Sequence, residues 1–187
     1  SVYTAPGSPY GIEILVKQGE NYVSLKPTDK NDLAFVPIQR DQVYAVRLVN
    51  DSKHDAGVTL TIDGLNAFTF SENHGYTQFV IPAGKTGLIE GWHRTNDVSD
   101  AFLVTEYAKS AAAELNQAGG SLGTITASFS AAWATDQSAP ADEPASPNQF
   151  SRAADATGRG PKVDAGFNEV TRQFGVIRGA VSVRYSK

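Results

Sequence analysis

The longest alternation of apolar and polar side chains in this chain runs from Thr124 to Trp133. Apolar residues occupy every second position, and four hydroxyl-bearing residues lie between them. A strand with one buried face shows this period of two, because successive side chains point to opposite sides of a sheet. Ten residues is long for a strand in a globular protein, so the segment requires a large sheet and favours a β fold.

Shorter segments of similar character precede and follow this run, separated by turn-forming residues. Strands are predicted at 11–17, 21–25, 33–38, 43–50, 58–62, 78–81, 86–90 and 98–106, then at 180–185 and more weakly at 166–176. Pro37 limits the third of these to an edge or an irregular strand. Asp63-Gly64 predicts a hairpin that leads into a strand through Phe68 and Phe70.

About ten short strands predict a single all-β domain over 1–187, an antiparallel, jelly-roll-like β-sandwich. Alternation on four separate strands motivates this prediction, and the core is expected to include Val46, Leu48, Leu60, Ile62, Phe70, Ile125, Phe129 and Val183.

Two segments depart from the strand pattern. Residues 107–116 are rich in alanine and predict one short helix that Gly119-Gly120 would end. The segment 134–162 is rich in Ala, Pro and Ser, and Phe150 is its one large apolar side chain. It predicts a long mobile loop or arm, because so few apolar groups cannot offset the entropy of ordering a backbone.

Composition excludes several classes of function. The chain has no cysteine, which rules out disulfides, thiolate metal sites and cysteine nucleophiles. A net charge of −4 argues against nucleic acid as a partner, and no apolar run is long enough for a membrane span. We expect no metal or organic cofactor, since His54, His74 and His93 lie about twenty residues apart and lack metal-ligand spacing.

Several blocks of the chain together resemble an uncharacterised family of small bacterial β-sandwich proteins. They are Gly-Ile-Glu-Ile-Leu-Val at 11–16, Tyr-Ala-Val-Arg-Leu-Val-Asn at 44–50, Asp-Gly-Leu-Asn at 63–66, Gly91-Trp92 and Val-Ser-Val-Arg-Tyr at 181–185. The resemblance covers about two thirds of the chain and fits less well at 107–121 and in the Pro-rich segment. It implies an all-β fold and no particular activity or catalytic residue.

The densest cluster of polar and aromatic residues lies at 91–97, with Tyr76 as a further candidate. As a ligand site, Trp92 and Tyr76 would stack on a sugar ring, and His93, Arg94, Asn96 and Asp97 would bind its hydroxyl groups. As purely structural residues, Trp92 would fill the core and Asn96-Asp97 would shape a turn. Turn chemistry accounts for every member, so the structural interpretation is favoured.

Motifs for catalysis are not found in the sequence. It contains no Gly-x-Ser-x-Gly, no His-Glu-x-x-His and no phosphate-binding glycine loop. Asp97, Asp100 and Glu106 could converge as the carboxylates of a hydrolase site assembled from loops, and Asp63 or Asp97 would be the first candidates for a calcium ligand. Neither interpretation has a supporting motif.

Three functional classes therefore remain. The first is a non-catalytic structural or assembly subunit of a surface layer or virus-like particle, acting through self-assembly or other protein–protein contacts. The second is a carbohydrate-binding module using Trp92 and Tyr76, and the third is a loop-site hydrolase. The first is favoured because strong signals mark only strands and turns, and it places the protein outside the cell, on its surface or in a virion.

Overall fold

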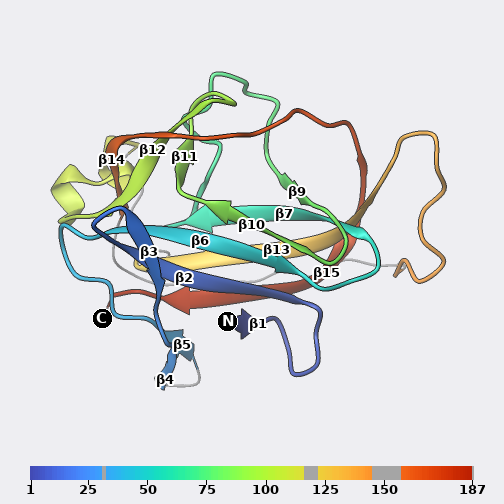
Figure 1. Ribbon diagram of the computed structural model, residues 1–187, viewed down its shortest axis with the longest axis horizontal. Coiled ribbons are helices and arrows are strands. Elements are labelled where there is room, and N and C mark those ends of the chain that lie inside the picture. Colours follow the sequence, from blue (N-terminus) through green and yellow to red (C-terminus); the bar gives the residue numbers. More distant parts are fainter. Residues whose placement is uncertain (31–32, 116–121, 145–156, 187) are drawn as a thin grey trace.

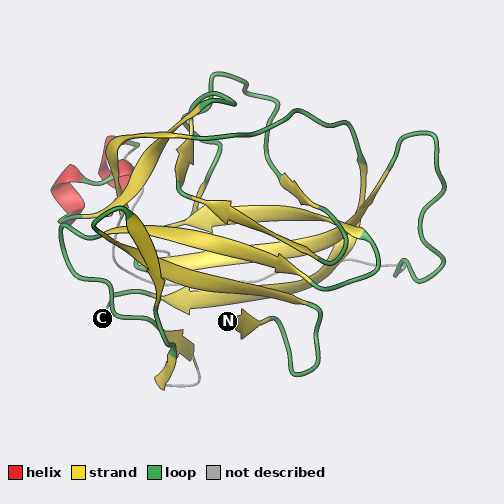
Figure 2. Cartoon of the chain, viewed as in Figure 1, coloured by secondary structure: helices red, strands yellow, loops and turns green. Residues whose placement is uncertain are grey.

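The computed structural model describes residues 1–30, 33–115, 122–144 and 157–186, and within them the chain forms two packed β-sheets. Figures 1 and 2 show β2 and β6 lying across β13 and β15, with the short helical segment at one end of the sandwich. The predicted all-β sandwich is confirmed.

The first sheet has eight strands. Its central order is β1-β2-β6-β12-β11, while β3 pairs with β2, β10 with β6 and β14 with β12. The strands are β1 (Val2–Tyr3), β2 (Tyr10–Gln18), β3 (Asn21–Ser24), β6 (Val43–Asn50), β10 (Lys85–Ile89), β11 (Gly91–His93), β12 (Val98–Val104) and β14 (Thr157–Asp164).

The second sheet has seven strands in the order β4-β5-β15-β13-β7-β8, with β9 paired to β7. They are β4 (Thr28–Lys30), β5 (Leu33–Phe35), β7 (Asp55–Ile62), β8 (Leu65–Asn66), β9 (Phe79–Ile81), β13 (Thr124–Trp133) and β15 (Gln173–Arg184). Pairing is antiparallel as predicted, except that β5 runs parallel to β15.

Apolar side chains of the two sheets meet in one core. Two aromatic pairs cross between the layers: Tyr10 of β2 stacks on Phe129 of β13, and Tyr44 of β6 packs against Tyr185 beyond β15. Their ring centroids lie 5.2 Å and 5.8 Å apart. The predicted core residues are confirmed, and Phe70 packs against the core in a partly buried position.

Asp63 forms the hairpin turn that the sequence predicts. Asp63 and Gly64 have φ angles of 55° and 82°, the left-handed pair that a type I′ turn requires between β7 and β8. The Asp63 carboxylate is fully buried and accepts hydrogen bonds from the Gly123 N–H at 2.8 Å and the Tyr185 hydroxyl at 2.6 Å. The turn therefore holds the start of β13 and the residue that follows β15.

Two predicted strands are corrected. The strand expected through Phe68 and Phe70 ends at Asn66, because the Asn66 side chain accepts a hydrogen bond from the Phe68 N–H at 2.9 Å and bends the chain into turns. The weak strand expected at 166–176 begins only at Gln173. From there β15 continues to Arg184 and includes most of the segment predicted as a separate last strand.

The Pro/Ala-rich segment is shorter than predicted. Its last residues belong to β14, which pairs antiparallel with β12 from Val98↔Asp164 to Val104↔Thr157. Residues 145–156 lie outside the described residues, and the mobility of the segment stays a prediction. Residues 157–162 are corrected from loop to strand, because pairing with β12 satisfies a backbone whose side chains carry no strand pattern.

The helical segment lies where it was predicted. It consists of a 3-10 turn at Tyr107–Lys109 and a short α1 at Ala111–Glu114. The Ser110 hydroxyl caps α1 by accepting a hydrogen bond from the Ala113 N–H at 3.1 Å. In the described part of the chain, no helix has the length and apolar character needed to cross a membrane.

We predict that Tyr185→Phe lowers the free energy of unfolding by about 1–3 kcal/mol, because the buried Asp63 carboxylate loses a hydroxyl donor. Urea denaturation measures the change. Tyr3→Phe is the matched control, since the Tyr3 hydroxyl makes an exposed contact of 3.4 Å with Asp51. Equal stabilities of the two variants would show that the Asp63–Tyr185 bond contributes nothing special.

Candidate functional site

Strand β11 carries two of the predicted site residues and directs them to different places. The Trp92 side chain is fully buried, and its ring makes edge contacts with Phe70 at 5.5 Å and Phe102 at 5.3 Å. A sugar therefore has no access to this ring, which corrects the use of Trp92 as a stacking platform. The structural interpretation of Trp92 as a core aromatic describes its position.

His93, the next residue, is buried among aromatic rings. Its Nδ1 lies 2.9 Å from the Ser71 hydroxyl and its Nε2 lies 3.0 Å from the Asn96 side-chain oxygen. The rings of Tyr76 and Phe167 pack against it with centroid separations of 5.6 Å and 5.2 Å. Burial lowers the pKa of His93 below its usual 6.5, although the contact with Asn96 acts in the opposite direction.

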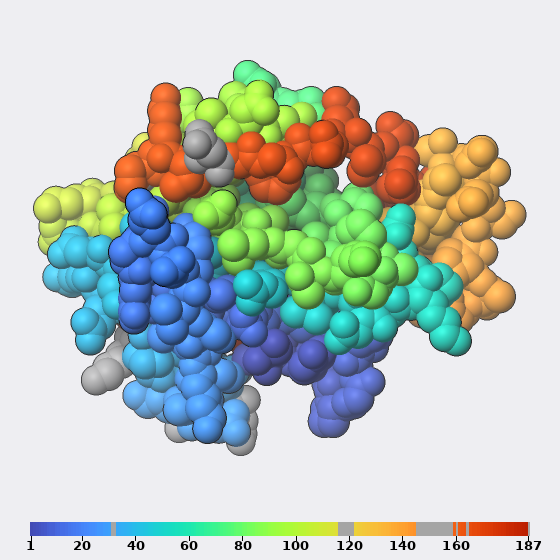
Figure 3. Space-filling model, in the orientation of Figure 1, coloured from blue at the N-terminus to red at the C-terminus, as the bar shows by residue number. Residues whose placement is uncertain are grey.

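Tyr76, His93 and Asn96 line the same cavity, which has a volume of about 510 Å³. Aromatic and aliphatic residues form most of its wall, and Gln78, Glu169 and Arg172 add polar groups. Figure 3 shows the orange-red chain that leads to β15 running across the upper part of the molecule, with green chain directly below it. Three of the six predicted site residues, Tyr76, His93 and Asn96, therefore line one mainly apolar cavity. Its volume is in the range of small-ligand sites.

Arg94 and Asp97 do not line this cavity. Arg94 donates a hydrogen bond to Asp100 at 2.9 Å and lines a second, polar pocket. Asp97 is exposed; its N–H donates to the Thr95 hydroxyl and its carbonyl accepts from the Ala165 N–H. Asp97 therefore shapes the turn between β11 and β12.

The second pocket, which we call the charged pocket, was not predicted. It has a volume of about 520 Å³ and is lined by Arg94, Asp100, Lys109, Glu114, Arg159, Pro161 and Lys162. These residues come from segments up to 68 positions apart, so no local sequence pattern marks the pocket. Gly158-Arg159-Gly160 within a Pro-rich segment is the one sequence signal that could have drawn attention to Arg159.

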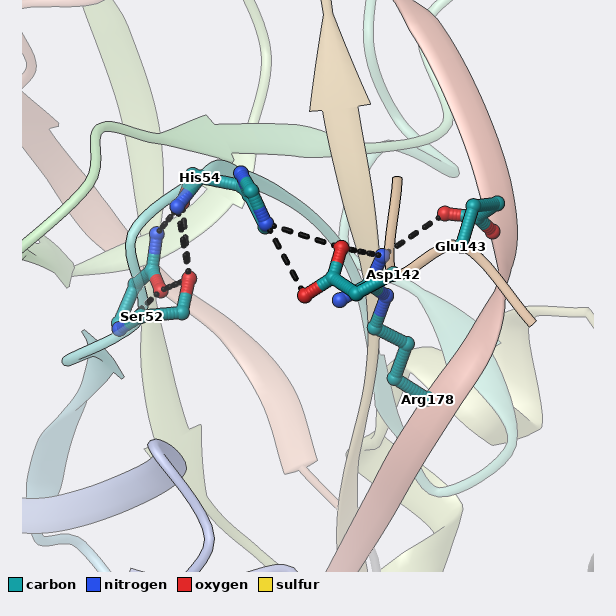
Figure 4. Close-up of polar contacts among 6 residues, drawn as sticks. Ser52, His54, Asp142, Glu143 and Arg178 are labelled. Carbon is teal, nitrogen blue, oxygen red and sulfur yellow. Dashed lines mark hydrogen bonds and ion pairs between the residues drawn. The ribbon is translucent and has the colours of Figure 1, made fainter. Parts of the chain in front are cut away.

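A third polar cluster contains Ser52, His54 and Asp142, the residue types of a hydrolase triad, but in a different arrangement. The Ser52 hydroxyl donates to the main-chain carbonyl of His54 at 2.9 Å, whereas the His54 ring points at Asp142 (Figure 4). His54 Nε2 lies 3.0 Å and 3.2 Å from the two Asp142 oxygens. The imidazole is therefore not placed to activate this hydroxyl.

Arg178 of β15 completes the cluster and holds residues 142–143 of the Pro/Ala-rich segment. Its guanidinium lies 3.1 Å from Asp142 and 3.0 Å from Glu143. Hydrogen bonds from Arg178 and His54 lower the pKa of Asp142 to about 2. Glu143 also accepts a hydrogen bond from the Val176 N–H at 2.9 Å. These contacts tie residues 142–143 to β15.

The carboxylates considered for hydrolysis have separate partners. Asp100 is paired with Arg94 and Arg159, and Glu106 is paired with Lys109. Within the described ranges, no group of three or more His, Asp or Glu side chains is close enough to hold a metal ion. The carboxylate of Asp63, a candidate calcium ligand, is buried and accepts hydrogen bonds from Gly123 and Tyr185.

Comparisons with protein-family models, curated proteins and solved structures find no significant match to this chain. The resemblance to a bacterial β-sandwich family thus stays a prediction.

We predict that His93 makes folding stability pH-dependent. Because its pKa is lowered in the folded state, the unfolded chain takes up a proton first as the pH falls through about 6.5, so stability decreases on acidification. Urea midpoints at pH 7.5 and 5.5 should therefore differ less for His93→Gln than for the natural chain. His74→Gln, in an exposed loop, is the control and should keep the full difference.

Proposed function

We propose that this chain is a non-catalytic subunit of a larger assembly, such as a surface layer or a particle, and acts through protein–protein contacts. The supporting observation is an open edge on strand β15. One edge of β15 pairs with β13 along most of the strand. Among the described strands, the opposite edge has a partner only at Val183 and Arg184, which pair with β5, while the Val176 N–H further along β15 donates to the Glu143 side chain. An open edge presents N–H and C=O groups that can pair with a strand of another chain.

A groove lies beside this open edge and gives an incoming strand side-chain contacts. It has a volume of about 1190 Å³, and Ala180, Val181 and Ser182 of β15 form part of its lining. The N-terminal segment 1–9 and the β4–β5 hairpin supply most of the rest, with Pro27 and Asp51 beside them, and Figure 1 shows β1 and β5 below β15. Tyr3 and Leu33, on the two sides, are exposed by 41% and 44%.

The lining suits an extended peptide better than acid–base chemistry. Its residues are mostly small or apolar, with Asp29 and Asp51 as carboxylates. Main-chain pairing would supply affinity without a particular sequence, and the apolar side chains on both sides would fix the register. We propose an extended segment from a second copy of the chain as the occupant, so that the groove links subunits.

We predict that the intact chain self-associates as its concentration rises and that Leu33→Lys weakens association. A charge at the groove replaces an apolar contact and disfavours edge pairing. Sedimentation velocity over a range of concentrations measures the assembly state. Leu115→Lys is the matched control, because Leu115 is also exposed, by 47%, but does not line the groove. A chain that stays monomeric at high concentration would rule the proposal out.

A second candidate function is the binding of a sugar or another small ring in the 510 Å³ cavity, supported by the convergence of Tyr76, His93 and Asn96 there. A glycan-array screen followed by calorimetric titration tests it. We expect Tyr76→Ala to weaken any ligand found by about tenfold, the effect of losing roughly 1.4 kcal/mol of ring contact. Tyr107→Ala is the control, since Tyr107 is exposed in the helical segment and does not line the cavity.

A further inference from the structure

We propose that the charged pocket binds a small doubly charged oxyanion, a phosphate or sulfate group. The pocket lies where β12 and β14 meet the turn after β11 and the helical segment. It shares no residue with the groove beside β15 or with the aromatic cavity, so the proposal is independent of both candidate functions.

Asp100 is the buried residue of the pocket, and two arginines bind the same oxygen of its carboxylate. Its side chain is 6% exposed, and one carboxylate oxygen, Oδ2, accepts hydrogen bonds from two arginines. Arg94 donates at 2.9 Å, while Arg159 donates through Nε at 3.1 Å and a terminal nitrogen at 3.0 Å. Two guanidinium groups thus share a single carboxylate oxygen, and Arg159 also donates to Glu114 at 3.2 Å.

Arg159 is held in place on several sides. Its guanidinium carbon lies 4.4 Å from the centroid of the Phe70 ring, a cation–π contact. The β12–β14 register also shifts between Asp100 and Phe102, and such irregularities often redirect side chains next to binding sites. A guanidinium fixed in this way loses little conformational freedom when a ligand binds.

Lysines extend the positive charge toward solvent. The pocket lining contains four cationic side chains and two carboxylates, Asp100 and Glu114, although the whole chain has a net charge of −4. Glu114 contacts Arg159 at 3.2 Å, and Glu106 outside the lining contacts Lys109 at 2.9 Å. Glu106 and Glu114 are both about half exposed, so an added anion can compete with them for Lys109 and Arg159.

This arrangement favours a phosphate or sulfate group over a carboxylate. With Glu106 beside Lys109 counted, the pocket has one positive charge in excess, and the donors Arg94, Lys109 and Lys162 outnumber the two oxygens of a single carboxylate. The donors come from the turn after β11, from β14 and from the helical segment. They surround the pocket from several directions, as a tetrahedral group requires.

Titration of the intact protein with inorganic phosphate and with inorganic sulfate, followed by amide NMR shifts at constant ionic strength, tests the proposal. Saturable shifts should centre on the charged pocket, with sodium chloride as the blank. Lys162→Gln and Lys109→Gln should each weaken binding about two- to fivefold, the effect of an exposed ion pair. Glu114→Gln should strengthen it by a similar factor, and Lys85→Gln, in β10 outside the pocket, should leave it unchanged.

The pH dependence distinguishes the two oxyanions. Phosphate gains its second charge at about pH 6–7, so its binding should strengthen between pH 5.5 and 7.5, whereas sulfate is a dianion throughout this range. The pocket is lined by arginine, lysine, aspartate and glutamate, and the nearby Glu106 is also a carboxylate. Shifts that do not saturate, or affinities unchanged in both Lys162→Gln and Glu114→Gln, would overturn the proposal.

Discussion

The buried carboxylate of Asp63 connects three parts of the chain that lie far apart in sequence. Its partners, the Gly123 N–H and the Tyr185 hydroxyl, are 60 and 122 residues away. A carboxylate deprived of such donors inside the protein is costly, so the β7–β8 turn, the start of β13 and the end of the last strand are stabilised together. These contacts coincide with the register in which Ile125 of β13 lies opposite Ile62 on one side and Val183 on the other. A slip by one residue would turn the apolar face of β13 to solvent.

Much of the sandwich can be predicted from sequence because its central strands carry their own pattern. The alternation in β13 indicates a strand with one buried face. The Asp63-Gly64 pair indicates a turn with two left-handed residues. Strand β14 has no such pattern. Its residues 157–162, Thr-Gly-Arg-Gly-Pro-Lys, form a strand because β12 offers an edge and Asp100 binds Arg159. The turns around Phe68 depend on one hydrogen bond to the Asn66 side chain, which competes with strand pairing. Such a bond produces no periodic pattern in the sequence.

The candidate site was predicted as one cluster, and the geometry of a strand explains why it is divided. Neighbouring residues of β11 point to opposite sides of the sheet, so Trp92 enters the core while His93 reaches the aromatic cavity. Arg94 lies beyond the strand and turns to Asp100. Sequence proximity therefore placed in one group residues that the fold separates. His93 and Arg94 each also have a partner that is distant in sequence: Phe167 packs on His93, and Arg159 completes the pocket of Arg94. Such partners cannot be found from local spacing.

The buried ionisable side chains also bear on what kind of function the chain supports. Acid–base catalysis needs a group that can exchange a proton with a bound ligand. In the described residues, Asp63, His93 and Asp100 are the buried Asp, Glu, His, Lys or Arg side chains, and each is engaged by internal donors or acceptors. Asp63 holds a turn, His93 is bracketed by Ser71 and Asn96, and Asp100 is shared by two arginines. The groups left to meet a partner include exposed lysines, carboxylates and His74, apolar groove residues and main-chain edges. Those groups bind through charge, contact area and backbone pairing, the interactions on which the proposed subunit contacts and oxyanion binding rest.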